Sequence, residues 1–314
     1  MKTKVLFKKN NNWMLLFLLL FGVATTQAQT SATALDFDGS NDIVIIPNTI
    51  PASAEKTYEA WVYPTRLSGH TVVLNHTNWT TGAIHFQFWD NKIHLDINYT
   101  ADYECTYSFD TNVWYHIATV YSTASKTMKF YVNGALIDTF AVDSDRVATI
   151  PANAQIELGG WHNDRYFKGK IDEVRIWNRA LSQGEIQSDM NCELTVNQAG
   201  LVAYYKFNQG NDSANNTSET SLTDASGNGN NGTLYNFDLN GTTSNWAASS
   251  PIVTGTTCAP LTYTLIPNSS FEQVLIDQNL DDMLDGKVLT ANINKVTTLS
   301  VGYTTVEDIT GIED

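Results

Sequence analysis

Residues 168–181 read KGKIDEVRIWNRAL, and the rest of the chain can be placed relative to this stretch. The apolar residues Ile171 and Ile176 mark a strand, with Asp172 and Glu173 side by side between them. Because neighbouring residues of a strand point to opposite faces, we expect Asp172 inward or at the rim and Glu173 on the opposite face. A buried carboxylate needs a cation, an arginine or backbone donors as its partner, so the first question is what faces Asp172.

The first 28 residues have the features of a secretory signal peptide. Four lysines precede an apolar run at residues 13–23, and small residues before and at Ala28 suit cleavage there. The run is short for a transmembrane span, which argues against the alternative, an uncleaved anchor. We therefore expect an exported protein, secreted or on the cell surface, with no transmembrane anchor after cleavage.

The chain is strongly acidic, with 18 basic and 33 acidic residues and a net charge of −15. Without the four lysines of the leader, 14 basic residues remain against 33 acidic ones, a net charge of −19. This balance argues against nucleic acid and anionic membranes as partners. It suits divalent cations, although solubility alone also explains it.

The chain has three cysteines, Cys105, Cys192 and Cys258. Export permits disulfides, but an odd number leaves one thiol unpaired within the chain. No C-x-x-C spacing occurs, so neither a zinc site nor a thioredoxin-type pair is indicated. We predict a disulfide between Cys192 and Cys258, since both flank the same segment.

Short alternating segments run from residue 34 to residue 190. Turn residues separate them, including Asp90-Asn91 and Asn133-Gly134; Asn-Gly is a strong hairpin signal because both positions need positive φ. Only residues 181–190 favour a helix, with Ser182 as its N-cap. The pattern predicts an all-β fold, an antiparallel sandwich or jelly roll.

Five motifs carry a family resemblance. In order, they read LDFDGSNDIVIIP, YEAWVYP, WYHIATVY, KFYVNGALI and KGKIDEVRIWNRALSQGEI. The series resembles the laminin-G-like, concanavalin A-like jelly-roll superfamily, in the branch related to pentraxins. The resemblance implies two curved antiparallel sheets, and a domain whose relatives commonly bind glycans, proteins or lipids, often with calcium.

The composition divides the chain into five parts. They are the signal peptide at 1–28, the jelly roll at 31–192, an Asn/Gly-rich extension at 193–250, a linker at 251–265 and a last segment at 266–314. We expect the extension to pack back on the jelly roll as an outer strand; the alternative is a second, eroded unit. The last segment resembles the start of a bacterial leucine-rich-repeat array. One repeat cannot bury its own apolar face, so we predict that the chain is a fragment; the alternative is a lone terminal unit.

Calcium is the expected cofactor, because it is bound by six to eight oxygens from carboxylates, amides and carbonyls. The resemblance implies that the turn after residue 37 and the strand at residue 172 are neighbours. It proposes these ligands: Asp38, the Gly39 carbonyl, Asn41, Asp42 and Asp172. In the alternative interpretation, Asp38 and Asp42 only cap the turn by accepting hydrogen bonds from backbone amides.

Catalysis is not predicted. Retaining glucanases of this fold need two carboxylates about 5 Å apart on one face. The laminarinase-like pattern E-x-D-x-x-E is missing, although a carboxylate pair from separate strands stays open. The histidines are scattered. His85 and His94 can face each other across a hairpin and could then bind a metal, but ordinary positions on the sheet surface are the favoured explanation.

A ligand surface is predicted where aromatic and polar residues meet. An exposed aromatic ring can stack on a sugar, and the segment at 161–166 combines two such rings with polar side chains. The predicted contacts are Trp161, His162, Asn163, Asp164, Arg165, Tyr166 and Trp79. For Trp161 and Trp79, packing in the core is the alternative. We predict a non-catalytic module that recognises an extracellular glycan or protein. A glycan hydrolase and a structural adhesion spacer are the alternatives.

Overall fold

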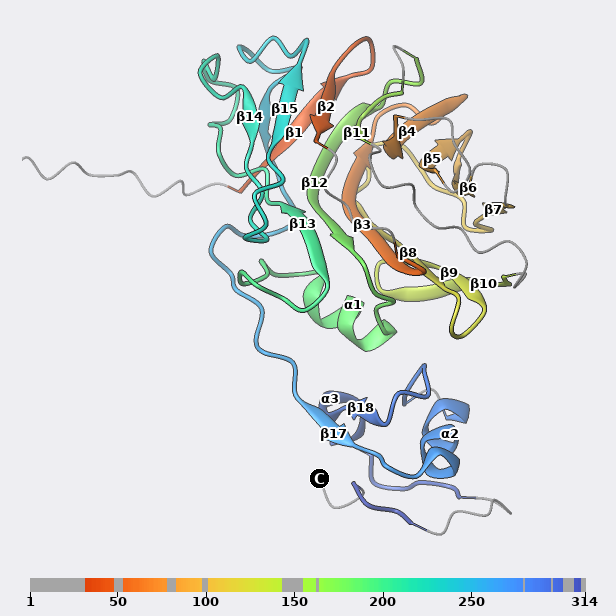
Figure 1. Ribbon diagram of the computed structural model, residues 1–314. Coiled ribbons are helices and arrows are strands. Elements are labelled where there is room, and N and C mark those ends of the chain that lie inside the picture. The colour runs from red at the N-terminus through yellow and green to blue at the C-terminus, as the bar shows by residue number, and fades with distance from the viewer. Residues whose placement is uncertain are drawn as a thin grey trace, which may run out of the picture.

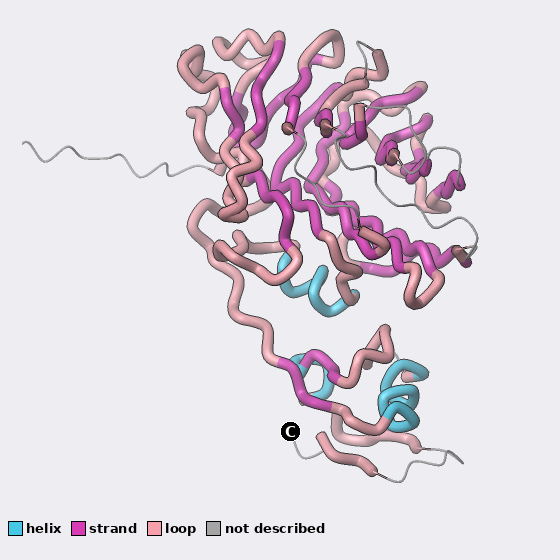
Figure 2. The backbone as a smooth tube through the Cα atoms, in the orientation of Figure 1, coloured by secondary structure: helices cyan, strands magenta, loops and turns pink. Residues whose placement is uncertain are grey.

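The computed structural model describes residues 32–47, 53–77, 83–97, 101–142, 155–161, 164–278, 280–294, 296–301 and 308–311. The expected signal peptide at residues 1–28 lies outside these ranges. Strands dominate the described chain, and two large antiparallel sheets pack face to face (Figures 1 and 2). The prediction of an all-β jelly-roll sandwich is confirmed. No helix in the described ranges is both long and apolar enough to cross a membrane.

The first sheet, sheet A, runs through the middle of the molecule. In spatial order its strands are β10 (Ala135–Ala141), β9 (Thr127–Val132), β8 (Tyr115–Ser122), β3 (Glu55–Pro64), β12 (Lys168–Trp177), β1 (Thr33–Asp38) and β16 (Trp246–Ala248). A further strand, β13 (Leu201–Tyr205), pairs with the second half of β12, where β1 has ended. The stretch quoted first in the sequence is therefore the central strand of sheet A, with three partners.

The second sheet, sheet B, has eight strands. In spatial order they are β14 (Ser221–Leu222), β15 (Gly232–Tyr235), β2 (Ile43–Ile46), β11 (Ile156–Leu158), β4 (His70–His76), β5 (Ile84–Trp89), β6 (Lys92–Ile97) and β7 (Ala101–Glu104). The turn at Asp90-Asn91 joins β5 to β6, as the sequence predicted.

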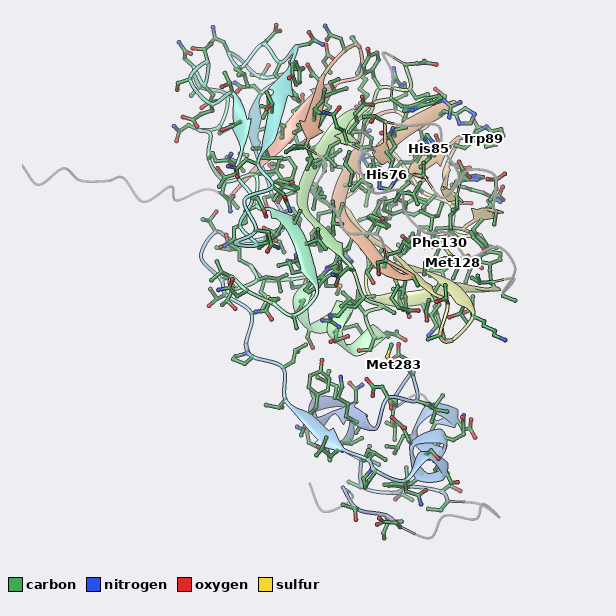
Figure 3. All side chains as sticks on the ribbon, in the orientation of Figure 1. His76, His85, Trp89, Met128, Phe130 and Met283 are labelled. Atoms are coloured by element: carbon green, nitrogen blue, oxygen red, sulfur yellow. A yellow bond between two sulfur atoms is a disulfide. The ribbon has the colours of Figure 1, made fainter. Side chains whose placement is uncertain are left out.

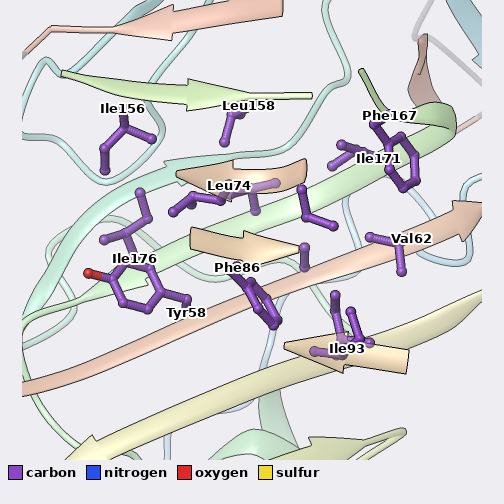
Figure 4. Close-up of a cluster of buried hydrophobic side chains, with 14 of the residues drawn as sticks. Tyr58, Val62, Leu74, Phe86, Ile93, Ile156, Leu158, Phe167, Ile171 and Ile176 are labelled. Atoms are coloured by element: carbon purple, nitrogen blue, oxygen red, sulfur yellow. The ribbon is translucent and has the colours of Figure 1, made fainter. Parts of the chain in front are cut away.

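The hydrophobic core fills the space between the sheets. Every second residue of a strand faces it, as the two-residue period of a strand requires. Met128 and Phe130 on β9 illustrate this alternation (Figure 3). The close-up in Figure 4 shows Tyr58 and Ile176 from sheet A packed with Phe86 from sheet B.

A β-bulge interrupts β12 at Asp172 and Glu173. The pairing with β3 shifts between Asp172 and Arg175, and Glu173 has a φ of +50°. Ile171 and Val174, on either side of the two acids, both face the core. The extra residue therefore keeps both carboxylates off the core side of the sheet. The expectation of an inward Asp172 and an opposite Glu173 is wrong, because alternation holds only where the pairing is regular.

The outer face of sheet A is covered by the helix α1 (Gln183–Asp189) and a second hydrophobic cluster that includes Trp177, Ile186 and Tyr204. Ser182 and Glu185 form the predicted capping box at the start of the helix. Figure 1 shows α1 at the end of the sandwich that faces the C-terminal segment.

The Asn/Gly-rich extension supplies strands to both sheets: β13 and β16 to sheet A, and β14 and β15 to sheet B. Its loop at 224–231 is held by polar contacts. The Asp224 carboxylate accepts hydrogen bonds from the backbone amides of Tyr204, Ser226 and Asn230, and from the Ser226 hydroxyl. A carboxylate with several such donors fixes a loop that has little apolar surface to bury.

The C-terminal segment is a small unit of β17 (Tyr263–Leu265), α2 (Ser269–Asp277), β18 (Lys287–Leu289) and α3 (Thr290–Ile293). Ile266, Phe271, Leu275 and Val288 form its own small core. Two hydrogen bonds join it to α1 of the sandwich: an Asp282 carboxylate oxygen accepts the Gln183 amide at the start of the helix at 2.8 Å, and the Tyr263 hydroxyl donates to Glu185 at 2.6 Å. The Leu289 side chain also packs against Gly184 of α1.

A disulfide joins Cys192 to Cys258, with their Cα atoms 5.0 Å apart. This is the pair that the sequence predicted, and Cys105 is a buried free thiol. The bridge connects the end of α1 to the stretch that leads into the C-terminal segment.

Candidate functional site

The outer side of sheet B carries polar and aromatic side chains where β4, β5 and β6 lie together. On β5, Ile84, Phe86 and Phe88 face the core, so the residues between them face outward. We use the name β4–β6 face for the side chains that point away from the core at His70, Asn75, His85, Gln87, Trp89, His94 and Asp96. Trp89 is exposed and His70 and Asp96 are partly exposed, whereas the other four are buried. Figure 3 labels His85 and Trp89 on β5.

A turn that begins at Trp161 lies against this face. Trp161 and Asp164 exchange backbone hydrogen bonds of 3.0 and 2.8 Å, and the Arg165 carbonyl accepts the Val72 amide of β4 at 2.9 Å. The Trp161 ring meets His85 edge-on, with their ring centroids 5.1 Å apart. The turn therefore brings one of the predicted aromatic residues onto the outer side of β4 and β5.

Arg165 joins the turn to the face. Its guanidinium lies 4.8 Å from the centroid of the Trp161 ring, and its Nη1 donates to the Gln87 Oε1 at 3.4 Å. The Gln87 Nε2 donates in turn to the Asp96 carboxylate. Burial raises the pKa of Asp96 to about 6, against the opposing effect of the Gln87 hydrogen bond. Gln87 thus bridges a cation and a carboxylate and has a fixed orientation.

Trp89 borders the face at the other end of β5. Its ring is tilted against two imidazoles, with centroid distances of 4.3 Å to His70 and 5.4 Å to His94. It remains 48% exposed, which is unusual for so large an apolar side chain. Burial lowers the pKa of His94, so its imidazole favours the neutral form that both donates and accepts hydrogen bonds.

Three of the predicted ligand residues, Trp79, His162 and Asn163, lie outside the described residues. The structure brings Trp161 and Arg165 to the face. Asp164 is exposed and accepts the Arg165 amide within its own turn. Tyr166 is only partly buried, beside Gly160 at the end of β11.

The sequence analysis did not identify Gln87 and Asp96 as site residues. Their signal was the predicted hairpin itself, because outward residues of paired strands must share a face. His85 and His94 share the face, but they are not opposite each other: His85 pairs with Asp96, and His94 pairs with Gln87.

The five predicted calcium ligands do not form one site. In the β1–β12 pairing Asp38 lies opposite Lys168, four residues along the strand from Asp172, or about 13 Å. Asp172 instead accepts hydrogen bonds from the Ser250 hydroxyl and the Glu173 amide. The family motif suggested that Asp38 and Asp172 are ligands of one ion, but the register of β1 and β12 keeps the two residues apart.

The turn at Asp38 is satisfied by protein groups. Asp38 Oδ1 accepts the Ser40 amide at 2.7 Å, and the two Asp42 oxygens accept the Asp38 amide and the Ser244 hydroxyl, both at 2.8 Å. Arg66 donates to the Gly39 carbonyl, and Asn236 donates to the Asn41 carbonyl. These contacts are the ones expected if Asp38 and Asp42 only cap the turn. In the described ranges, the group of three possible ligand atoms within 4.8 Å of one another is Asp189 with the two disulfide cysteines.

Glu173 on β12 and Glu59 on β3 belong to a buried cluster of ion pairs under α1. Arg175 Nη2 contacts Glu173 Oε2 at 2.8 Å, and its Nη1 lies 3.8 Å from Glu59 Oε1. All three side chains are at most 1% exposed. Burial raises the pKa of Glu173, and Arg175 opposes this rise. Two carboxylates from separate strands do meet here, but they share a guanidinium in the interior and face no groove.

Residues 38–187 match the family model described as the concanavalin A-like lectin/glucanases superfamily, which confirms the predicted jelly-roll domain for that stretch. The match ends before the C-terminal segment, so it lends no support to a leucine-rich-repeat array there. A search of curated proteins finds no match.

Several solved structures are similar to this chain. A candidate carbohydrate-binding protein from Bacteroides ovatus is 20% identical, with a TM-score of 0.53 over 65% of this chain and 58% of that one. This chain therefore spans little more than half of that protein. A heptameric pentraxin from Limulus polyphemus is 16% identical, with a TM-score of 0.44 over 51% of this chain and 82% of that one. Domain 4 of an arabinanase from Geobacillus stearothermophilus, in complex with arabinotriose, is 26% identical, with a TM-score of 0.42 over 49% of this chain and 74% of that one.

Proposed function

We propose that this protein is an exported, non-catalytic module that binds a glycan on the β4–β6 face. The observation that carries the proposal is the composition of that face. Its accessible positions are Trp89, which is 48% exposed, and the partly exposed His70, Asp96 and Trp161, while the amide and imidazole side chains of Asn75, Gln87, His85 and His94 are buried between them. Such groups match the hydroxyls of a sugar, and aromatic rings match its apolar faces. The matching family model, named for lectins and glucanases, supports this ligand class.

The test is a glycan array followed by titration of the best ligand against Trp89→Ala. We expect this variant to bind at least about tenfold more weakly, because an exposed aromatic anchor supplies a large share of such affinity. Since Trp89 is 48% exposed, its removal leaves the core intact. Circular dichroism should show an unchanged fold.

The matched control is Tyr235→Ala. Tyr235 on β15 is an aromatic residue of sheet B with nearly the same exposure, 46%. It lies four strands from β5, about 19 Å across the sheet. We expect normal binding by this variant. Equal losses in both variants, or none in either, would place the ligand elsewhere.

A hydrolase of this fold is the second candidate class. It requires two carboxylates beside a substrate groove. Glu59 and Glu173 lie under α1 in contact with Arg175, and the Asp96 carboxylate, opposite Asp102 on β7, is held by the Gln87 amide. We therefore propose binding without cleavage. Incubation with each glycan that binds should release no reducing ends.

We also propose that calcium binds to the turn that contains Asp38 and Asp42. Burial raises the pKa of Asp42 to about 7, and the charges of Asp38 and Asp238 add to the rise. A cation would relieve this repulsion, and each carboxylate oxygen can still use a second lone pair. We expect 1 mM calcium to raise the melting temperature by about 3 °C, and Asp42→Asn to abolish the rise.

The exposed Asp164→Asn serves as the control for that titration and should keep the wild-type response. An unchanged melting temperature in wild-type protein would contradict calcium binding and leave Asp38 and Asp42 as caps of the turn.

A further inference from the structure

We propose that the glycan bound on the β4–β6 face is acidic, and that Arg165 binds the carboxylate of one of its sugars. This inference rests on the proposed function and adds the substrate class. The sugars with this chemistry are uronic acids and sialic acids, each with a single carboxylate among neutral hydroxyls.

The Arg165 guanidinium carries a positive charge that is not paired with a carboxylate of the described residues. Two of the arginines that the structure describes have no acidic partner, Arg66 and Arg165; Arg66 donates instead to the Gly39 and Tyr166 carbonyls. Arg175 contacts Glu173, and Arg179 contacts Glu185, each at 2.8 Å. Among the residues that the structure describes, no carboxylate lies within 4.0 Å of the Arg165 guanidinium. Within the described ranges, its guanidinium makes one hydrogen bond, the long one to Gln87, which uses one of its five donors.

The backbone and the side chain of Arg165 are both held in place by contacts with neighbouring residues. Its φ is +54°, a conformation that residues other than glycine rarely adopt. Two backbone hydrogen bonds maintain it: the Arg165 carbonyl accepts the Val72 amide, and its amide donates to the Asp164 carboxylate at 2.7 Å. The guanidinium then rests on the Trp161 ring. Strained backbone concentrates at binding sites, and a guanidinium fixed in this way loses little freedom when it binds a carboxylate in a bidentate manner.

Acidic side chains lie near Arg165, and they limit the number of negative charges that a ligand can carry. Asp96 is linked to Arg165 by two hydrogen bonds, through Gln87. Glu157 on β11 is paired with Asn75, and Asp102 on β7 is paired with Asp96. These acids disfavour a polyanion such as a sulfated glycan or a polyphosphate. One carboxylate at the guanidinium, with neutral hydroxyls over the rest of the face, fits this charge distribution.

The experiment compares acidic oligosaccharides with their neutral counterparts by titration calorimetry. Trigalacturonate is paired with its carboxyl-reduced form, and sialyllactose with lactose, so the two arms distinguish uronic from sialic acids. We expect one carboxylated member to bind at least about tenfold more tightly than its neutral partner. Arg165→Gln should remove this preference, and Arg165→Lys should restore only part of it, because lysine cannot bind in the bidentate manner.

The matched control is Arg179→Gln. Arg179 also lies over a tryptophan, 5.0 Å from the centroid of the Trp177 ring, but it is paired with Glu185 beside α1. This variant should keep the preference for the acidic member. Equal affinity for acidic and neutral glycans, with no effect of Arg165→Gln, would overturn the acidic-ligand inference while the Trp89→Ala result still supports glycan binding. Absence of binding to every glycan of the array would overturn both.

Discussion

Arg175→Met is expected to lower the free energy of unfolding by about 3–5 kcal/mol, because it leaves buried carboxylates without their cation. Arg175 is 1% exposed, and its guanidinium contacts four groups. Nη1 donates to the Asp189 carbonyl and Nη2 to the Cys192 carbonyl, and both nitrogens lie near acids, Glu59 and Glu173. The arginine therefore ties sheet A to the end of α1 and to the disulfide.

The measurement is urea unfolding of wild-type and variant proteins at pH 7. Arg179→Met is the control, because its ion pair with Glu185 is partly exposed and should contribute no more than about 1 kcal/mol. The double variant Glu173→Gln/Arg175→Met should recover part of the loss, since one uncompensated charge is removed with its partner. A loss below about 1 kcal/mol in the single variant would show that Arg175 does not hold the cluster together.

The double variant Cys192→Ala/Cys258→Ala is expected to be about 4 kcal/mol less stable than the wild type, from the entropy of an open loop in the unfolded chain. The two cysteines are 66 residues apart in sequence. The loop between them contains β13, β14, β15 and β16, so the bridge restricts a large part of the unfolded chain. The measurement is urea unfolding with and without a thiol reductant.

The reductant provides the control within the same experiment. It should lower the stability of the wild type to that of the double variant and leave the double variant unchanged. Cys105→Ala should retain the response of the wild type, because Cys105 is a free thiol. A wild type that is indifferent to reductant would mean that the two sulfurs are not joined in solution.

The architecture was predictable because it follows from the two-residue alternation of the strands and from the turn residues between them. The alternating segments and the turns at Asp90 and Asn133 are local signals, and each corresponds to strands of the sandwich. The bulge in β12 was not predictable in this way. It depends on Glu173 adopting positive φ where the neighbouring strand changes from β1 to β13, and a strand pattern carries no information about that neighbour.

The candidate site was predictable in part. Trp161 and Arg165 were identified from composition, because aromatic and polar residues were adjacent in sequence. Gln87 and Asp96 come from two different strands, and only their register places them beside Arg165. The calcium set failed for the same reason: Asp38 and Asp172 were joined by a motif, but the register of β1 and β12 separates them.

The disulfide also determines how the molecule bears a load. A pull on the C-terminal segment reaches the sandwich through the disulfide from Cys258 to Cys192, at the end of α1, and through the weaker hydrogen bonds of Tyr263 and Asp282 with α1. The 66-residue loop between the two cysteines lies off this path, so its four strands carry no tension while the bridge is intact. The β4–β6 face lies on the other sheet, away from the disulfide.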